Sequence, residues 1–219
     1  MFYDRQDAGK RLAQKLQKYR GSDAIVLALP RGGVVLGYEI ARELRLPLDT
    51  ISVRKIGHPS NPEYALCAVD ERGMRLCNEE EVALMDHDWL ATETRRQIKE
   101  AKRRASLYRA DREPFMLKNK VAIIVDDGIA TGFTVRVAVL VVKKQKPTKV
   151  VIAVPVISED LYRELKEGVD ELITLTPPEE FLGAVGSHYA HFDQVQDSEV
   201  IRLLESARKF SHQANFRNL

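Results

Sequence analysis

Two adjacent carboxylates stand where an apolar segment meets a loop rich in glycine and threonine. Residues 121–125 are apolar, Asp126 and Asp127 follow directly, and a Gly- and Thr-bearing run occupies 128–134. Backbone N–H groups at the start of a helix hold a phosphate, glycines let the backbone approach it, and threonine hydroxyls add donors. Carboxylates beside such a pocket can accept hydrogen bonds from ribose hydroxyls. The pattern predicts a sugar-phosphate site, since the glycine spacings of Walker and dinucleotide-binding motifs are both missing.

A second candidate anion site follows an earlier apolar run. Residues 24–29 are too few for a buried helix, and Pro30-Arg31-Gly32-Gly33 comes next, before a stretch in which apolar residues repeat at helical spacing to Leu44. This order predicts a strand, a glycine turn and a helix, and open α/β sheets bind ligands at such strand ends. The alternative is a tight turn with a surface arginine.

The remaining pattern indicates which elements position these loops. Further strands are expected at 48–56, 150–156 and 172–175, with helices at 8–19, 131–146 and 158–167. The valines within 131–146 favour a strand, but parallel neighbours need a crossover helix, and Pro147 suits its end. We therefore predict an α/β fold with a mainly parallel sheet of about five strands, helices on both faces, and a single domain over 1–219.

An insertion at about 57–113 interrupts this alternation. We expect a loop at 57–61, a hairpin formed by 64–69 and 74–77 around the turn at 71–73, and then one or two helices to about 109. Six basic residues suggest nucleic-acid binding: Arg95, Arg96, Lys99, Lys102, Arg103 and Arg104. Because Glu93 and Glu100 interrupt the run, a solvated helix face is favoured instead.

Composition excludes several classes of protein. The net charge of +2 creates no global field for nucleic acid or an anionic membrane, and the longest strongly apolar stretch, near 135–142, is short of the ~20 residues of a membrane span. The first residues lack a signal-peptide pattern, so a soluble, unexported, cytoplasmic protein is expected. Cys67 and Cys77 show neither metal-ligand nor redox spacing and are interpreted as packing residues.

At 121–134 the sequence resembles the type I phosphoribosyltransferases, whose motif for 5-phosphoribosyl-1-pyrophosphate (PRPP) is an apolar strand, two acidic residues and a Thr-Gly-x-Thr loop. Phe133 departs from the smaller residue expected there. Outer motifs extend the resemblance over nearly the whole chain: Asp4-Arg5-x-Asp7-Ala8-Gly9, Val53-Arg54-Lys55, Asn61-Pro62-Glu63, and Ala184-Val185-Gly186 with Tyr189 and Phe192.

The resemblance implies a role for each matching residue. Asp126 and Asp127 would be catalytic and bind the ribose hydroxyls. The 5-phosphate would be held by Gly128, Ile129, Ala130, Thr131, Gly132 and Thr134, and the pyrophosphate by Arg31, Gly32, Gly33 and Lys55. Strand alternation places Arg54 on the face opposite Lys55. His58 is either a proton carrier or a surface residue.

The implied activity is Mg²⁺-dependent transfer of the phosphoribosyl group from PRPP to a nitrogenous acceptor, with release of pyrophosphate. Magnesium would be held mainly by substrate and water rather than by direct protein ligands. A C-terminal hood at about 177–196 would border the acceptor, with Phe181 and Tyr189 as stacking faces; the 78–113 insertion is the alternative location. A non-catalytic PRPP- or nucleotide-sensing regulator and a phosphate-releasing hydrolase are the competing functions, and a homodimer is compatible with the pattern.

Overall fold

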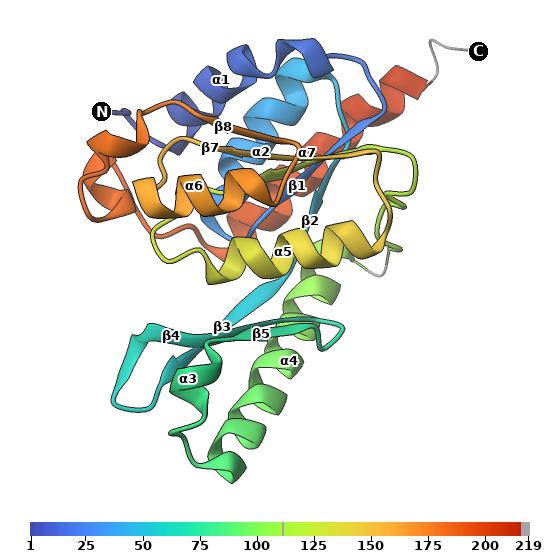
Figure 1. Cartoon of the computed structure of the whole chain (residues 1–219). Helices are drawn as coiled ribbons and strands as arrows, with labels where there is room; N and C mark the ends of the chain where they lie inside the picture. Colours follow the sequence, from blue (N-terminus) through green and yellow to red (C-terminus); the bar gives the residue numbers. More distant parts are fainter. Residues whose placement is uncertain (111, 216–219) are drawn as a thin grey trace.

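The computed structural model of the chain describes residues 1–110 and 112–215, and its body is built on a five-stranded parallel sheet (Figure 1). The strands lie in the order β2-β1-β6-β7-β8. Their bounds are β1 (Ala24–Ala28), β2 (Leu48–Thr50), β6 (Val121–Val125), β7 (Lys149–Val154) and β8 (Glu171–Thr174). Ala28 pairs with Val125, and Val125 pairs with Ala153. The residues after β1 and β6 therefore leave the sheet at the same edge.

Helices cover both faces of this sheet, as the sequence predicted. On one side pack α1 (Arg5–Lys15), α2 (Gly32–Leu44) and α7 (Asp197–Asn215), and on the other α5 (Phe133–Lys144) and α6 (Glu159–Glu167). Alternate strand residues divide between two cores: Val26 and Ile123 face the first group, while Ile25 and Ile124 face the second. Three short 3-10 helices complete the body at Gln17–Tyr19, Pro178–Glu180 and Val185–His188.

The sequence predicted one of two helices, α5, and missed the other, α7. The valine-rich segment is the helix α5, because the parallel pair β6 and β7 requires a crossover on this face. Helix α7 was not predicted, although Val200, Leu203 and Leu204 are buried at helical spacing and could have indicated it. None of the helices in the described ranges is long and apolar enough to cross a membrane.

A second, smaller unit projects from the body, and we call residues 53–109 the appendage (Figure 1). Its antiparallel sheet has the order β3-β4-β5 and is followed by two helices. The bounds are β3 (Val53–His58), β4 (Asn61–Asp70), β5 (Arg75–Cys77), α3 (Glu79–Val82) and α4 (His87–Arg109). The single strand predicted for 48–56 is wrong. The chain leaves the main sheet after Thr50, and Val53 begins a strand that pairs with β4.

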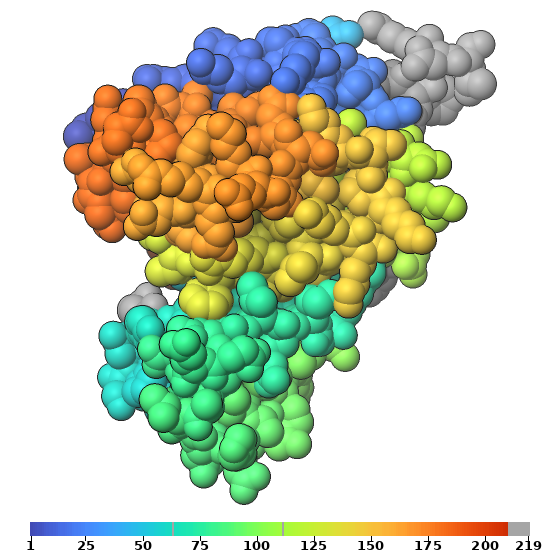
Figure 2. Space-filling view, viewed as in Figure 1, coloured from blue at the N-terminus to red at the C-terminus, as the bar shows by residue number. Residues whose placement is uncertain are grey.

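Two helices enclose the small sheet. Ile56, Cys67 and Val69 pack against Leu90 of α4, and α5 of the body contacts β3, β4 and β5 from its other side. In the space-filling view the surface of α5, in yellow, lies directly against the appendage, in teal (Figure 2). The appendage is thus anchored to the helix that follows the predicted phosphate loop.

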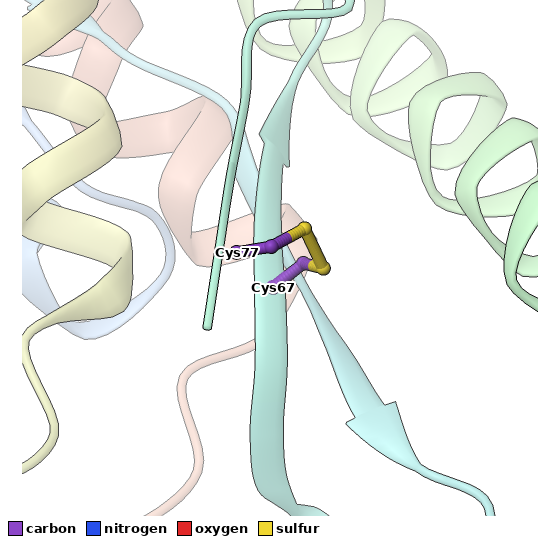
Figure 3. Close-up of a disulfide and its surroundings, with 2 residues drawn as sticks. All are labelled: Cys67 and Cys77. Carbon is purple, nitrogen blue, oxygen red and sulfur yellow. A yellow bond between two sulfur atoms is a disulfide. The ribbon is translucent and has the colours of Figure 1, made fainter. Parts of the chain in front are cut away.

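Cys67 and Cys77 form a disulfide between β4 and β5 (Figure 3). The interpretation of both as unlinked packing residues is therefore wrong. The antiparallel register places Cys67 directly opposite Cys77, with 4.0 Å between the two Cα atoms. Spacing along the chain did not indicate this pairing, because the register of the two strands decides which side chains meet.

Candidate functional site

The acid pair follows β6 at the carboxyl edge of the main sheet. The backbone N–H of Asp127 donates to Asp126 Oδ1 at 2.9 Å, so the first carboxylate supports the backbone of the second. Burial, and then the charge of Asp127, raise the pKa of Asp126 well above its ordinary value; the nearby Lys55 acts in the opposite direction. Burial therefore favours the protonated form of Asp126.

Asp127 is paired with Arg5, a residue to which the sequence assigned no role in the site. Arg5, in the first turn of α1, donates from Nε to Asp127 Oδ2 at 2.7 Å, and only 12% and 17% of the two side chains are exposed. Its guanidinium lies 3.8 Å from the centre of the Phe192 ring and donates to the Asp193 backbone oxygen. Arg5 belonged to a quoted outer motif, but nothing in its spacing linked it to residue 127.

The glycine–threonine loop connects the acid pair to α5. The Ile129 N–H donates to the Val156 oxygen at 3.0 Å, and the Ser158 N–H donates to the Ile129 oxygen, so the loop is fixed to the segment after β7. Gly132 is the residue that precedes α5 and has a φ of 75°, a conformation in which side chains are strained. The loop thereby leads from the acid pair into the first turn of α5, whose N-terminal N–H groups have no partner within the helix.

The turn after β1 lies against the acid pair. The peptide bond between Pro30 and Arg31 is cis, and α2 begins at Gly32. A Cβ at Gly32 would lie 1.9 Å from Asp127 Oδ2, so only glycine fits there without rearrangement. The Arg31 side chain extends toward α7, with its Nη1 3.9 Å from Asp197 Oδ1. The structure therefore brings the two predicted loops into contact.

A cavity of about 750 Å³ opens beside these loops. Its lining includes Pro30, Lys55, both aspartates, residues 128–132 and Thr134, together with Arg54 and His58 of the appendage. Arg31, Gly32 and Gly33 do not belong to this lining. His58 Nδ1 accepts a hydrogen bond from the Ser60 N–H in the β3–β4 turn.

The two residues proposed to stack on the acceptor lie away from this cavity. Tyr189 is buried between Phe2 and Phe192, and its hydroxyl donates to the Asp127 backbone oxygen at 2.6 Å. Phe181 stacks on His188. From the hood segment it is Val185 that reaches the cavity wall. The observed contacts of Tyr189 support the acid pair rather than a ligand in the cavity.

One face of α4 forms the opposite wall of the cavity, where the sequence favoured a solvated helix face. Arg95, Lys99 and Lys102 are exposed, as that interpretation requires. Arg96 and Arg104 from the same basic run line the cavity, together with Trp89, Glu93 and Gln97. The helix therefore presents one basic face to solvent and another to the site.

Within the described residues, no three His, Cys, Asp or Glu side chains converge as a metal cluster. Two neighbouring carboxyl groups beside glycine-bearing loops nevertheless fit Mg²⁺, which is commonly held by one or two carboxylates plus substrate phosphates and water.

A parallel α/β sheet with an acid pair and two glycine loops at one edge is the arrangement that the resemblance at 121–134 implies. The sequence model of the phosphoribosyl transferase domain family matches residues 3–189. The chain belongs to this family.

Relatives and solved structures agree with this assignment. Over 211 residues the chain is 41% identical to a Mycobacterium tuberculosis (strain H37Rv) protein named "Putative phosphoribosyl transferase", which covers 95% of the chain; the chain spans 47% of that relative. TT1426 from Thermus thermophilus has a similar crystal structure, with 39% identity and a TM-score of 0.77 over 94% of this chain and 99% of that one. The chain thus spans about half the length of its curated relative and nearly all of TT1426.

Proposed function

We propose that the cavity binds PRPP and that the chain transfers its phosphoribosyl group to a nitrogenous acceptor, releasing pyrophosphate. The observation that carries this proposal is the meeting of the acid pair with two loops that each open a helix: Gly32 lies against Asp127, and residues 128–134 lead into α5. In this reading the ribose lies at the acid pair and the 5-phosphate at the start of α5. The pyrophosphate lies at the start of α2, near Lys55.

The charges of the site match the chemistry of this transfer. Breaking the bond from the anomeric carbon to pyrophosphate leaves positive charge on the ribose and negative charge on the leaving group. The acid pair favours the ribose cation, and the raised pKa of Asp126 suits it to take a proton from the acceptor nitrogen. Lys55 lines the cavity and favours the leaving group. Arg31 and the Gly32–Gly33 N–H groups lie outside that lining and are proposed to act on the pyrophosphate from the start of α2. Mg²⁺ would be held mainly by substrate oxygens and water beside the acid pair, and it would neutralise charge on the pyrophosphate.

Calorimetric titration of PRPP with Mg²⁺ tests the binding step. An Asp126→Asn, Asp127→Asn double variant should lose roughly ten- to a hundredfold in affinity per lost charged hydrogen bond, each worth about 1.5–3 kcal/mol. Asp23→Asn, which changes an 82% exposed side chain, is the matched control. Equal PRPP affinity in the double variant and the wild type would refute the assignment of the ribose site.

Pyrophosphate release distinguishes catalysis from sensing. A regulator on this fold would bind PRPP through the same loops yet release no pyrophosphate with any acceptor. We expect release that depends on an added nitrogenous base. Release without an acceptor would instead indicate a hydrolase.

A further inference from the structure

The α4 wall of the cavity carries polar and charged side chains in addition to the groups that a ribose phosphate requires. Its residues occupy one helical stripe: Trp89, Glu93, Arg96, Gln97 and Arg104. None of them belongs to the loops that receive the 5-phosphate or open α2. The stripe therefore suggests that the cavity holds a further chemical group on the side of the appendage.

Arg54, on β3, lines the cavity beside this wall and contacts it through Gln97. It has the same strand parity as Ile56, which packs in the core under α4, whereas Lys55 alternates to the other face. Its Nε donates to Gln97 Oε1 at 3.1 Å, and the Gln97 amide, only 8% exposed, donates to Glu93 Oε1 at 2.7 Å. Arg54 is thus oriented by a buried neutral amide. Among the residues that the structure describes, it forms no ion pair.

The neighbouring carboxylates compensate the charge of Arg54 only in part, through Glu93 and Glu100. Glu93 is occupied by a two-point contact from Arg96, and Glu100 is shared between Arg103 and Arg104. Burial, and then the charge of Arg104, lower the pKa of the Arg54 guanidinium; Glu100 opposes them, while Arg31 and Arg96 lower it further.

A partly buried cation among other cations is unfavourable unless a counter-charge is present. In a folded protein such an arrangement is typical of a site that is completed by an anionic ligand. Arg54 lines the cavity, and among the described residues its only hydrogen bond is the one from Nε. The planar guanidinium fork suits the oxygens of phosphate or carboxylate.

We propose that Arg54 and Arg104, with Gln97 orienting Arg54, form an oxyanion subsite on the appendage side of the cavity, separate from the loop at 128–134. The subsite takes a phosphate, pyrophosphate or carboxylate group. That group comes either from the pyrophosphate end of PRPP or from an anionic acceptor; this choice rests on the proposed function, whereas the subsite itself does not.

Titrations with three simple probes test the subsite in the full chain. The probes are inorganic pyrophosphate, ribose 5-phosphate, and inorganic phosphate added to protein saturated with PRPP and Mg²⁺. In Arg54→Gln we expect a loss of about tenfold or more for pyrophosphate or for the added phosphate, with ribose 5-phosphate changed by less than about twofold. Arg104→Gln should reproduce the loss, and Arg54→Lys should retain part of the affinity.

The pattern of losses identifies the source of the oxyanion. If the subsite holds the end of PRPP, then pyrophosphate and PRPP lose affinity together. If it holds an anionic acceptor, both keep their affinity and only the added phosphate stops binding. Arg95→Gln, which removes an exposed charge from the same helix, is the matched control and should change none of the titrations.

Two results would overturn the proposal. One is an unchanged affinity for all probes in Arg54→Gln and Arg104→Gln, with an unfolding midpoint equal to that of the wild type. The other is an equal loss in Arg95→Gln, which would indicate a diffuse field. Failure of the proposed function gives a different result. If the Asp126→Asn, Asp127→Asn double variant kept its PRPP affinity while Arg54→Gln lost affinity for pyrophosphate, the subsite would be supported and the proposed function would not.

Discussion

The glycine–threonine loop of the body and the arginine-bearing face of α4 in the appendage line the same cavity but are built from different interactions. The loop at 128–134 is positioned by backbone hydrogen bonds to the segment after β7, and the neighbouring turn by a glycine in contact with Asp127. On α4 the arginines are positioned by glutamates one turn away on the same helix. Backbone geometry allows little adjustment, whereas side-chain pairs can exchange partners when a ligand enters. We infer that the body determines where a sugar phosphate sits and that the appendage adapts to what accompanies it.

The largest expected effect is that of Gly32→Ala in the body. The added methyl carbon would lie only 1.9 Å from Asp127 Oδ2, so the acid pair or α2 must shift. We expect PRPP affinity to fall about a hundredfold or more, and the free energy of unfolding by about 1–3 kcal/mol. Calorimetry and urea denaturation measure the two changes.

Gly168→Ala serves as the control for Gly32→Ala. A Cβ at Gly168 meets only the Leu165 backbone oxygen, at 3.6 Å, so both properties should stay close to wild type. Wild-type PRPP affinity in Gly32→Ala would show that the contact between the two loops does not form the site.

Breaking one ion pair in each region gives the next comparison. Arg5→Ala leaves the nearly buried Asp127 without its partner and should lower the free energy of unfolding by about 3 kcal/mol. Arg96→Ala removes the arginine that pairs with Glu93. Because the Arg96 side chain is 71% exposed, no resolvable change in the free energy of unfolding is expected. Urea denaturation of both variants checks this difference. Similar losses would contradict the distinction between a rigid body site and an adaptable appendage wall.

Opening the disulfide should affect the appendage alone. The bond closes a loop with a sequence separation of 10, for which a loss of about 2 kcal/mol of local stability is expected in Cys67→Ser, Cys77→Ser. Hydrogen exchange should accelerate at amides in β5 and α3, while amides of β6 and β7 act as the internal control. Equal acceleration in both sheets would show that the two regions unfold as one unit.

The smallest effect concerns pH, and the two regions should respond with opposite signs. The hydrogen bond from Arg103 lowers the pKa of Glu100 from 4.5 to about 2, so this carboxylate contributes stability above pH 4.5 that is lost as the pH falls toward 2. Glu100→Gln should therefore lower the free energy of unfolding by about 1 kcal/mol at pH 7, after allowance for solvent screening. The difference should shrink on acidification below pH 4.5.

Asp126 supplies the contrast in the body. Its pKa is raised on folding, so the stability it contributes is present at acid pH and is lost as the pH rises through its folded pKa. Asp126→Asn should consequently gain stability relative to wild type as the pH rises. Denaturation curves from pH 3 to 8 test both variants. Parallel pH profiles would contradict the opposite pKa shifts of Glu100 and Asp126.

The sequence by itself was sufficient for the parts of the site that are continuous along the chain. An apolar strand, Asp126, Asp127 and the glycine–threonine loop occupy consecutive positions, and local backbone rules connect them to the helix that follows. The same holds for Pro30 to Gly33 and for the crossover logic that made α5 a helix against the β propensity of its valines. These predictions rest on interactions among near neighbours, which periodicity and turn chemistry report.

Only the tertiary structure decided which distant side chains complete the site. Arg5 contacts Asp127 although 122 positions separate them in the sequence. Cys67 meets Cys77 through the register of β4 and β5. Arg54 meets Gln97 only because the chain leaves the main sheet after β2 and β3 packs under α4. Tyr189, an aromatic that the sequence offered as a stacking face, instead donates to the Asp127 backbone. Each of these contacts depends on how elements that are distant in the sequence pack together. For Arg54 and Cys67, a one-residue change of strand register would turn the side chain to the opposite face of the sheet.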